Sequence, residues 1–574
     1  MKRLNHQVDF CVVGGGMAGL CAAISAARHG AKVAIVHDRP VFGGNASSEI
    51  RMHVCGADRH GKIKNVRETG ILEELRLENL RRNHLKSFSI WDTILYEKVM
   101  LEPNIRYYLN CSVLDAEMDG SRIKSVTGWQ LTTQTYHTIE AKIFADCSGD
   151  AVLAPLTGAE FRIGREARSE YGESIEPEVA DRKTMGMTCL FQAHDTGEPQ
   201  VFEPPSWAHD FPTEADIPNR HHGWLEMGYW WVELGGEDDS IHDTERIRDE
   251  LLKIVYGIWD HLKNHGDHGA ANWALDWVQF LPGKRESRRY MGDHVLTQND
   301  VEAEGRFPDT GAFGGWTMDD HNPGGFKYKG KPTIFHPAPS PYGIPYRSLY
   351  SKNIENLMFA GRCASASHAA MSSTRVMGTG SVMGQAIGTA AAIAVKHHLE
   401  PRGVGELIHE LQQTLLLDDC YLPRVKQEFS TLTHRAALKA SSGDPEPLRD
   451  GINRPVGDDQ HAWDGKIGDS LEYTWDGLQT VRGVSFVFDS ALSKIIAMSY
   501  HQKDNQLVDT PPEVVKDFRV EIRTPEGWKL WKQVTGNHQR LARIEINTTA
   551  TGARATFDST WGAEEVRLYA FYID

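Results

Sequence analysis

The segment Val8–Gly19 reads VDFCVVGGGMAG and joins a short run of strand-forming residues to three consecutive glycines. The alanine-rich stretch Leu20–His29 then predicts a helix that ends at Gly30, and Lys32–Val36 predicts a second strand. A strand, a G-x-G-x-x-G turn, a helix and a second strand within about thirty residues form a βαβ unit of the doubly wound type. The sequence therefore predicts an α/β domain at the start of the chain.

The glycine turn of this unit is suited to the pyrophosphate of a dinucleotide. Gly14 permits a tight turn, Gly16 lets the backbone approach a phosphate, and Gly19 lets the helix pack closely on the strand. The N–H groups and the dipole at the start of the helix attract the negative charge. A glycine-rich turn without a function is the alternative, but the flanking strand and helix favour the dinucleotide. The predicted contacts are Gly14, Gly15, Gly16, Met17, Ala18 and Gly19.

The end of the second strand departs from the usual pattern. His37 occupies the place of the acidic residue that holds the ribose hydroxyls, and Asp38 comes one residue later. Either Asp38 reaches the ribose, or the ribose is held in another way. A second glycine pair lies in the following segment, Arg39–Glu49 (RPVFGGNASSE). Its small and hydroxyl-bearing residues suit a backbone that wraps a second flat or anionic group.

Two later segments repeat the pattern of a strand followed by glycine. After a helix near Ser89–Leu101, strands are predicted at Arg106–Leu109, Arg122–Gln130, Gln134–Ile139 and Lys142–Ala145, and the turn Asp146–Ala151 (DCSGDA) closes the run. Much later, Asn356–Arg362 (NLMFAGR) leads through Cys363–Arg375 into an Ala- and Gly-rich helix at Gly384–Val395. The small residues of that helix predict close packing against another element or a cofactor.

Together these motifs resemble the FAD-dependent oxidoreductases of glutathione-reductase-like fold, and more narrowly a large bacterial branch of them. The resemblance rests on the first glycine turn, GGNASSE, DCSGDA and the segment 341–392, PYGIPYRSLYSKNIENLMFAGRCASASHAAMSSTRVMGTGSVMGQAIGTAAA. It covers residues 8–165 and 310–400 well and the region between them more loosely. It implies an α/β, Rossmann-like FAD-binding domain with an inserted α+β substrate domain, and FAD as the cofactor.

The resemblance also implies FAD contacts beyond the first turn. They are His37 or Asp38 with Arg39 at the ribose, Gly43, Gly44, Asn45 and Ser48 along the pyrophosphate and flavin edge, Ser148, Gly149 and Asp150 at the adenosine half, and Gly361 and Arg362 at the ribityl-phosphate end. The helix that starts near Gly380–Gly384 would direct its N-terminus at the pyrimidine edge of the flavin. Its dipole would stabilise the anionic reduced flavin.

Five segments follow from the motifs and the composition. They are 1–165 and 336–400 as the two parts of the FAD-binding domain, 166–335 as a substrate-covering insertion, 401–440 as a helical tail, and 441–574 as a β-sandwich. The insertion is rich in aromatic and histidine residues, namely His221, His222, Trp224, Tyr229, Trp230, Trp231, Trp259, Trp273, Trp277 and Trp316. Each alone is more often a packing residue. Their excess favours a ring-shaped or polyhydroxylated substrate, because aromatic faces stack on sugars.

The C-terminal third changes in pattern. Pro401–Lys439 predicts helices, and Ser441–Pro447 (SSGDPEP) predicts a linker. Alternating β patterns then predict an eight-stranded sandwich of about 130 residues. The segments 448–465 (LRDGINRPVGDDQHAWDG) and 564–573 (EEVRLYAFYI) resemble discoidin-like, galactose-binding-like modules, which often bind sugars. In this position the module either binds a sugar or braces the enzyme or an oligomer interface.

Composition restricts the partners and the compartment. Among the 574 residues, 62 Lys and Arg against 78 Asp and Glu give a net charge of −16, which disfavours nucleic acid and anionic membranes. The eight cysteines are scattered without a CxxC pair, and the longest apolar stretch, Met383–Val395, is too short to span a bilayer. We predict a cytoplasmic protein with a small-molecule substrate. The electron acceptor and a homo-oligomeric state are left open.

Metal ligands are not predicted. No His, Cys and Asp residues stand at metal-ligand spacing along the chain, His221-His222 is ambiguous, and His397-His398 suits the surface at a helix end.

Catalysis on such a cofactor requires a proton-transferring group near the substrate. Hydride removal from an alcohol carbon needs a base at the hydroxyl, and protonation of a double bond needs an acid there. The candidates beside the motifs are His368, Arg375, Arg51, His53 and His321, and for each a structural role is the alternative.

The leading hypothesis is hydride transfer between a small sugar-like or polyol substrate and N5 of FAD. A second is reduction of an activated double bond in a carboxylate held by paired arginines. A third, of another class, is a carbohydrate-binding protein with a non-catalytic flavin domain. An NAD-binding module is a further alternative, which the distant segment around Gly361-Arg362 disfavours.

Overall fold

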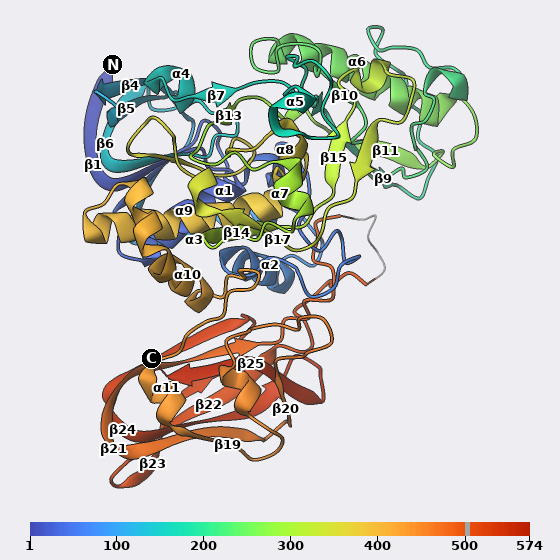
Figure 1. Ribbon diagram of the computed structural model, residues 1–574. Coiled ribbons are helices and arrows are strands. Elements are labelled where there is room, and N and C mark those ends of the chain that lie inside the picture. Colours follow the sequence, from blue (N-terminus) through green and yellow to red (C-terminus); the bar gives the residue numbers. More distant parts are fainter. Residues whose placement is uncertain (500–504, 574) are drawn as a thin grey trace.

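The computed structural model describes residues 1–499 and 505–573. Its first core is built on a seven-stranded sheet of order β3-β2-β1-β6-β5-β4, with β18 beside β6 (Figure 1). The strands are β1 (Lys2–Val13), β2 (Val33–Val36), β3 (Ile105–Tyr108), β4 (Cys111–Asp119), β5 (Arg122–Gln130), β6 (Thr135–Asp146) and β18 (Leu357–Phe359). β1 runs parallel to β2 and β6, whereas β4, β5 and β6 form an antiparallel meander. The segments predicted as two strands at 134–139 and 142–145 are one strand, β6.

Helices cover this sheet. They include α1 (Met17–Arg28), α2 (Ile71–Arg82), α3 (Phe88–Met100), α4 (Leu153–Thr157), α8 (His368–Thr374), α9 (Met377–His397) and α10 (Ile408–Leu417). α1 and α9 pack against one another at glycine positions. A Cβ on Gly388 would stand 2.2 Å from the carbonyl oxygen of Ala22, so the two backbones touch. Met17–Ala27 of α1 and nearly all of α9 are buried.

The second core belongs to the insertion and packs around the long helix α6 (Thr244–Asn264) (Figure 1). Its strands are β8 (Met187–Thr188), β9 (Phe191–Asp195), β10 (Glu233–Leu234), β11 (Trp273–Val278) and β12 (Gly283–Lys284). Tyr229, Trp231 and Trp259 are buried in this core, as expected of packing residues. The predicted domain bounds remain a prediction, and Tyr290 and Val301, assigned to the insertion, pack in the first core instead.

Shorter elements connect the two cores. They are β7 (Phe161–Arg162), α5 (Arg168–Tyr171), η2 (Glu214–Asp216), β13 (Arg289–Tyr290), α7 (Gln298–Glu302), β14 (Thr310–Gly314), β15 (Met318–His321), β16 (Thr333–His336) and β17 (Tyr342–Pro345). β14 pairs with β17, and β15 pairs with β16. The β15–β16 hairpin lies beside α8, on the side of the first core that faces the insertion (Figure 1).

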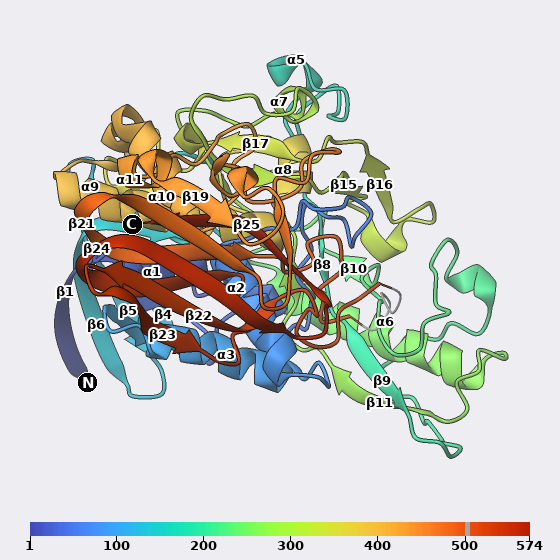
Figure 2. The ribbon, with the colours of Figure 1, turned by 90° about the horizontal axis from the view of Figure 1, so that it is seen from below.

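The C-terminal region is an antiparallel β-structure below the first core (Figures 1 and 2). Its strands are β19 (Ala437–Ala440), β20 (Trp463–Lys466), β21 (Ser470–Phe488), β22 (Val515–Thr524), β23 (Gly527–Val534), β24 (Leu541–Thr560) and β25 (Glu565–Ile573). The described residues thus contain seven strands where eight were predicted. β19 pairs with β21, so the sheet starts ahead of the predicted boundary at 441.

The region between α9 and this sheet is only partly helical. The structure has the 3-10 segment Pro401–Leu407, α10, and the short helix α11 (Thr431–Arg435). Residues 418–430 form neither helix nor strand, and 437–440 form β19, so the prediction of helices throughout 401–439 is wrong there. The leucines of α10 predict a long helix, but α10 ends at Leu417, where polar residues follow.

The sandwich is joined to the first core by a buried polar contact. The side chain of Arg67 pairs with Glu73 and donates to the carbonyl oxygens of Ser490 and Ala491. A small apolar cluster of Leu77, Leu80 and Ile496 lies at the same boundary. All eight cysteines are buried and free of disulfides. In the described part of the chain, no helix combines the length and the apolar character that crossing a bilayer requires.

Candidate active site

Two glycine loops face one another at the start of α1. Gly14 has φ +103°, Gly43 has φ +108° and Gly44 has φ +59°, conformations that glycine adopts without strain. Gly43 donates its N–H to the carbonyl oxygen of Gly15 at 2.9 Å, which holds the loops together. A Cβ on Gly16 would meet only the Cα of Gly44, at 3.9 Å, so the space between the loops is open to a ligand.

The N-terminus of α1 opens into that space. Its N-cap, Gly16, supplies no side-chain cap, so the first N–H groups of the helix are available to a phosphate. A Cβ on Gly19 would stand 1.9 Å from the carbonyl oxygen of Gly14, which explains the third glycine of the fingerprint by close packing. The pyrophosphate of FAD fits this cradle. Met17 and Ala18 are buried in the same first turn of α1.

His37, at the end of β2, supports the first loop. Its Nδ1 accepts the N–H of Gly15 at 3.0 Å, and burial lowers the pKa of His37 to about 4. The ring is therefore neutral at pH 7, and Nε2 is buried with no hydrogen-bond partner among the described residues. The Asp38 side chain is 62% exposed and lies 3.3 Å from the ring. Of this pair, Asp38 is the residue open to a ribose.

The other predicted contacts of the second loop, Arg39, Asn45 and Ser48, each contact neighbouring residues of the protein. Asn45 Nδ2 donates to the carbonyl oxygen of Lys284 at 3.2 Å, which links the loop to the insertion. Ser48 donates its N–H to Asp92, and Arg39 lies 3.9 Å from Glu49.

The turn after β6 is held by its own side chains. Ser148 Oγ donates to Asp146 at 2.6 Å, and Asp150 pairs with Arg362 at 2.6 Å and with Lys284 at 2.8 Å. Burial would raise the pKa of Asp150, but Arg362 and Lys284 hold it well below its ordinary value. A Cβ on Gly149 would stand 2.7 Å from Arg362 Nε, so the turn and Arg362 form one unit.

The structure corrects the role of Gly384. α9 begins at Met377, so Gly384 lies within the helix and not at its N-terminus. A Cβ there would stand 2.0 Å from the carbonyl oxygen of Ala18, which makes Gly384 a packing residue between α9 and α1. Gly361, in contrast, has φ +91°, and a Cβ there would meet only the Cβ of Ala18.

A cavity of about 670 Å³ lies between the first core and the insertion. Asn45 and Arg362 line it, so it borders the predicted cofactor contacts. Four of the five predicted catalytic residues line it as well, namely Arg51, His53, His321 and Arg375. Its aromatic lining includes Trp224, Trp230, Trp277 and Trp316 from the group that the sequence singled out. Ser499 brings the C-terminal region to the same wall.

His53 lies in a cluster with two residues that the sequence analysis did not select. The Nε2 atoms of His53 and His60 are 3.0 Å apart, and Cys55 Sγ lies 3.5 Å from His60 Nε2. Burial lowers the pKa of His60 and raises the pKa of Cys55 to about 12. His60 is therefore a neutral imidazole and Cys55 a neutral thiol at pH 7. The donor atoms of the three residues are close enough to share a metal ion.

His321 has a different electrostatic environment. Its Nδ1 lies 2.6 Å from Glu233, and its Nε2 lies 3.3 Å from Asp319. Burial alone would lower the pKa of His321, but the two carboxylates raise it above its ordinary value. Arg375 pairs with the same Asp319 at 3.1 Å. In this corner of the cavity the two carboxylates therefore favour the protonated form of the His321 imidazole.

Two residues of the cavity lining carry buried hydrogen-bond donors. Arg375 Nε and Trp316 Nε1 are buried and have no partner among the described residues. Arg51 stacks on Trp277, with 4.4 Å between the guanidinium carbon and the ring centroid, and donates to Gln192 at 2.6 Å. Buried donors without partners are costly, so Arg375 and Trp316 favour a ligand rich in oxygen acceptors.

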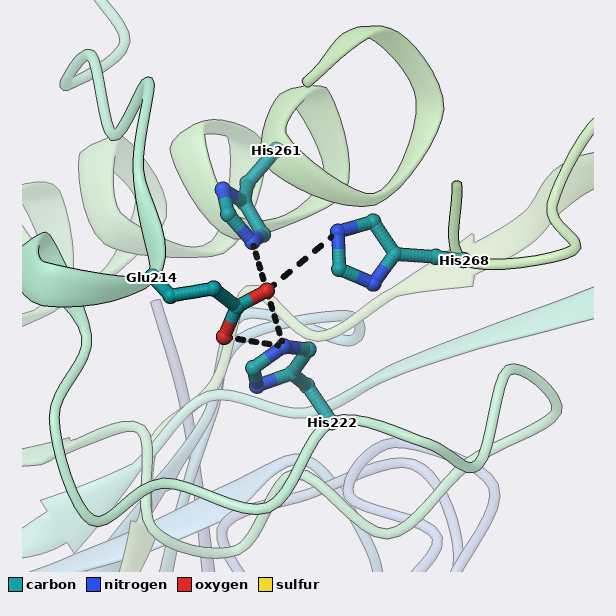
Figure 3. A group of neighbouring side chains, drawn as sticks. All are labelled: Glu214, His222, His261 and His268. Carbon is teal, nitrogen blue, oxygen red and sulfur yellow. Dashed lines mark hydrogen bonds and ion pairs between the residues drawn. The ribbon is translucent and has the colours of Figure 1, made fainter. Parts of the chain in front are cut away.

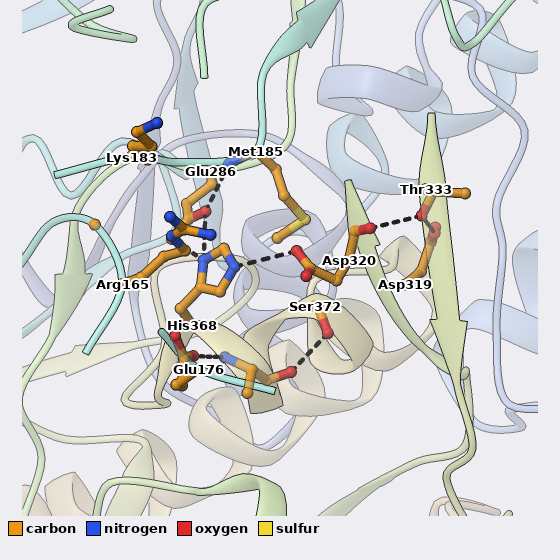
Figure 4. Close-up of polar contacts among 12 residues, drawn as sticks. Arg165, Glu176, Lys183, Met185, Glu286, Asp319, Asp320, Thr333, His368 and Ser372 are labelled. Atoms are coloured by element: carbon orange, nitrogen blue, oxygen red, sulfur yellow. Dashed lines mark hydrogen bonds and ion pairs between the residues drawn. The ribbon is translucent and has the colours of Figure 1, made fainter. Parts of the chain in front are cut away.

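The structure contradicts the prediction of His368 as a base (Figure 4). The side chain is 1% exposed and does not line the cavity. Nδ1 lies 2.9 Å from Glu286 and Nε2 lies 3.3 Å from Asp320. Burial alone would lower the pKa of His368, but Glu286 and Asp320 raise it well above its ordinary value. An imidazolium held by two carboxylates cannot accept a substrate proton, so His368 has a structural role.

Sequence reasoning missed several residues of the cavity wall. They are Arg59, His60, Lys62, Lys284 and Arg285, and Glu233 lies behind the wall, against His321. A local signal existed for His60, because it follows His53 by seven residues in a glycine-interrupted loop. Glu233 and Arg285 carried no such signal, since only the tertiary fold brings them to His321.

Comparison with known proteins adds the family. Residues 9–415 match the model of a family described as FAD dependent oxidoreductase. No curated protein matches the chain.

Solved structures were compared as well. The chain is similar to a geranylgeranyl bacteriochlorophyll reductase-like protein from Thermoplasma acidophilum, with 11% identity over 72% of this chain and 86% of that one and a TM-score of 0.35. It is also similar to family 32 carbohydrate-binding modules. That of Streptococcus pneumoniae EndoD has 18% identity over 25% of this chain and 99% of the module, with a TM-score of 0.20. That of C. perfringens NanJ, in complex with galactose, has 8% identity over 25% and 95%, with a TM-score of 0.19.

Proposed function

Because the chain belongs to the FAD dependent oxidoreductase family, with FAD as its cofactor, we propose that it oxidises a hydroxyl-bearing carbon of a small sugar-like or polyol substrate in the cavity. The observation that carries this proposal is a cavity lining that combines the His53–His60 pair with four tryptophans. The same cavity borders Asn45 and Arg362, where the cofactor contacts are proposed.

The tryptophans and the unpaired donors would position the substrate. A volume of about 670 Å³ suits a small ligand of this class. Trp230 and Trp277 offer faces for stacking on a sugar ring. Trp316 Nε1 and Arg375 Nε would each donate to a substrate oxygen and thereby satisfy their own hydrogen-bonding capacity.

The histidine pair would take the proton. Removal of a hydride from the carbon and of a proton from its hydroxyl leaves a carbonyl group, and FAD, when bound, would supply the hydride acceptor. A neutral imidazole of the pair accepts the hydroxyl proton, and the 3.0 Å contact lets the second ring share the charge that develops. The cationic His321 would favour the partial negative charge on the substrate oxygen, since its own charge is held by Glu233 and Asp319.

A second candidate function is reduction of an activated double bond in a carboxylate. Among the described residues, the cavity lining carries Arg51, Arg59, Lys62, Lys284, Arg285, Arg362 and Arg375, against one carboxylate, that of Asp319. Several of these cations already have protein partners. Arg375 pairs with Asp319, but its Nε has no partner among the described residues. An anionic substrate would complete that pairing, and His321 would then act as the proton donor.

Anaerobic titration separates the two functions and the non-catalytic alternative. We expect that a sugar or polyol from a panel bleaches the flavin absorbance of the purified holoprotein and that no unsaturated carboxylate reoxidises the chemically reduced enzyme. The reverse result would support the second candidate. Failure of both panels would support a non-catalytic flavin domain.

The free buried cysteines agree with the proposed cytoplasmic location.

A further inference from the structure

A group of four potential metal ligands lies in the insertion, away from the cavity (Figure 3). Glu214 begins the 3-10 segment Glu214–Asp216, His222 lies in the loop before the second core, His261 belongs to the last turns of α6, and His268 follows that helix. Their donor atoms all lie within 4.8 Å of one another. The four side chains point toward a common centre near the Glu214 carboxylate.

The spacing of the donor atoms matches a tetrahedral ion. The Nε2 atoms of His222 and His261 each lie 3.3 Å from Glu214 Oε1, and His268 Nε2 lies 3.6 Å from it. A tetrahedral Zn²⁺ with bonds of about 2.0–2.1 Å holds its ligand atoms about 3.3 Å apart. These three distances are close to the spacing of ligands around a four-coordinate ion. His268 Nε2 also lies 3.0 Å from the carbonyl oxygen of His265, so this ring would exchange that hydrogen bond for the ion.

Backbone contacts prepare two of the imidazoles as ligands. His261 Nδ1 lies 2.7 Å from the carbonyl oxygen of Phe211, and His222 Nδ1 lies 2.8 Å from that of Arg220. A carbonyl oxygen only accepts, so both Nδ1 atoms carry the hydrogen and both Nε2 atoms present a lone pair in the neutral ring. This is the outer-shell arrangement that orients metal-binding histidines.

The lone pairs and the carboxylate converge on one point, which a bound cation would occupy. In the neutral rings, the Nε2 lone pairs of His222 and His261 both face an oxygen of Glu214, and a divalent ion between them would coordinate to all three atoms. His261 is 1% exposed and the Glu214 side chain is 66% exposed, so the site would lie at the edge of the core of the insertion.

We propose that Glu214, His222, His261 and His268 bind one Zn²⁺ ion as a structural site. Imidazole and carboxylate ligands in tetrahedral order suit Zn²⁺. The ion would tie two loops to the end of α6. One of them leads from His222 to Trp224, which lines the cavity, so the site would fix part of the cavity wall.

The test is metal content and zinc affinity of the full-length holoprotein. After removal of metal with a chelator and titration with Zn²⁺ alone, we expect uptake of one equivalent and a higher unfolding temperature. We expect His268→Ala and Glu214→Gln to weaken zinc binding by more than the roughly 10–100-fold that loss of an outer-shell partner costs. Both side chains are partly exposed, 14% and 66%, so both variants should fold and keep their flavin absorbance.

Two controls make the outcome specific. His242→Ala removes an exposed histidine at the start of α6 and should leave zinc binding unchanged. Cys55→Ser alters a second group with metal-ligand geometry, His53, Cys55 and His60, and should also leave the single equivalent in place. A third such group is Asp210, Asp260 and His265. Loss of zinc in Cys55→Ser, unchanged zinc affinity in both His268→Ala and Glu214→Gln, or no stoichiometric uptake by the wild-type protein would overturn the proposal.

Discussion

His53 Nε2 lies 3.0 Å from His60 Nε2 in the wall of the cavity, so only one of the two rings can donate in this contact. The other ring accepts with its lone pair. Burial lowers the pKa of His60, so the His60 ring is neutral near pH 7. A base next to a substrate hydroxyl needs this state. The contact therefore joins two residues from one loop into a single proton-accepting unit.

We expect His60→Ala to lower the rate of substrate-dependent flavin reduction by roughly 10²–10⁴-fold, the usual contribution of a positioned base. Because the pKa of His60 lies below its ordinary value of 6.5, the wild-type rate should be flat above pH 6.5 and fall at lower pH as the ring is protonated. Stopped-flow absorbance measures both. His409→Ala, an exposed histidine remote from the cavity, is the matched control. An unaltered rate in His60→Ala would remove the base from the proposed function.

Close packing of α1 on α9 makes a second prediction. Alanine in a helix usually gains up to about 1 kcal/mol over glycine. In Gly384→Ala, however, the new Cβ would stand 2.0 Å from the carbonyl oxygen of Ala18, and overpacking costs about 1–3 kcal/mol. We expect a net loss of stability in urea unfolding, together with weaker FAD retention, because α1 carries the phosphate-binding turn. Gly405→Ala, where a Cβ meets nothing within 4 Å, should be neutral, and equal midpoints for the two variants would contradict the packing role.

The sequence was sufficient for elements whose cause is local. The first βαβ unit follows from alternation and from glycines that the turn requires. α1 and β2 lie close to their predicted positions, whereas β1 starts at Lys2 and not at Val8. The family assignment follows from several ordered motifs, and the match over residues 9–415 confirms it. Four of the five catalytic candidates line one cavity because they lie next to those motifs.

The remaining parts of the site depend on contacts between distant segments. His368 stands in a motif segment as His53 does, and only the fold shows that Glu286 and Asp320 enclose it. Gly384 looked like a helix start because its small neighbours hide where α9 begins. The ligands of the proposed zinc site come from two loops, a helix end and a 3-10 turn, so their spacing along the chain carries no motif.

The pH dependence of stability gives a third prediction. Burial raises the pKa of Glu176 from 4.5 to about 7, although the nearby His368 opposes the shift. A carboxyl that binds its proton more tightly when folded contributes stability that is complete below pH 4.5 and is lost as the pH rises through about 7. We expect Glu176→Gln, which mimics the protonated form, to remove up to about 3 kcal/mol of that pH dependence.

Thermal unfolding at pH 5 and pH 8 measures this effect. The wild-type protein should lose more stability between the two values than Glu176→Gln, so the variant should be the more stable protein at pH 8. Glu178→Gln changes an exposed carboxylate two residues away and should behave as the wild type. Parallel curves for Glu176→Gln and the wild type would show that Glu176 is ionised in the folded protein at both pH values.

The boundary between the first core and the sandwich gives the last prediction. Arg67 is fully buried, pairs with Glu73 at 2.7 Å, and donates to the carbonyl oxygens of Ser490 and Ala491 at 3.0 Å each. Removal of one partner from a buried ion pair costs about 3–5 kcal/mol, because the other charge stays buried. We therefore expect Arg67→Ala to lower the unfolding midpoint strongly.

The matched control is Arg82→Ala at the end of α2, whose exposed ion pairs with Glu78 and Glu97 are worth less than about 1 kcal/mol. Deletion of the sandwich should resemble Arg67→Ala, since it removes the same carbonyl partners and also Ser499 from the cavity wall. A chain ending at residue 436, ahead of β19, should thus lose stability and bind substrate more weakly. If that chain unfolds and turns over as the full protein does, the sandwich is an accessory, and the buried Arg67 contact does not stabilise the enzyme.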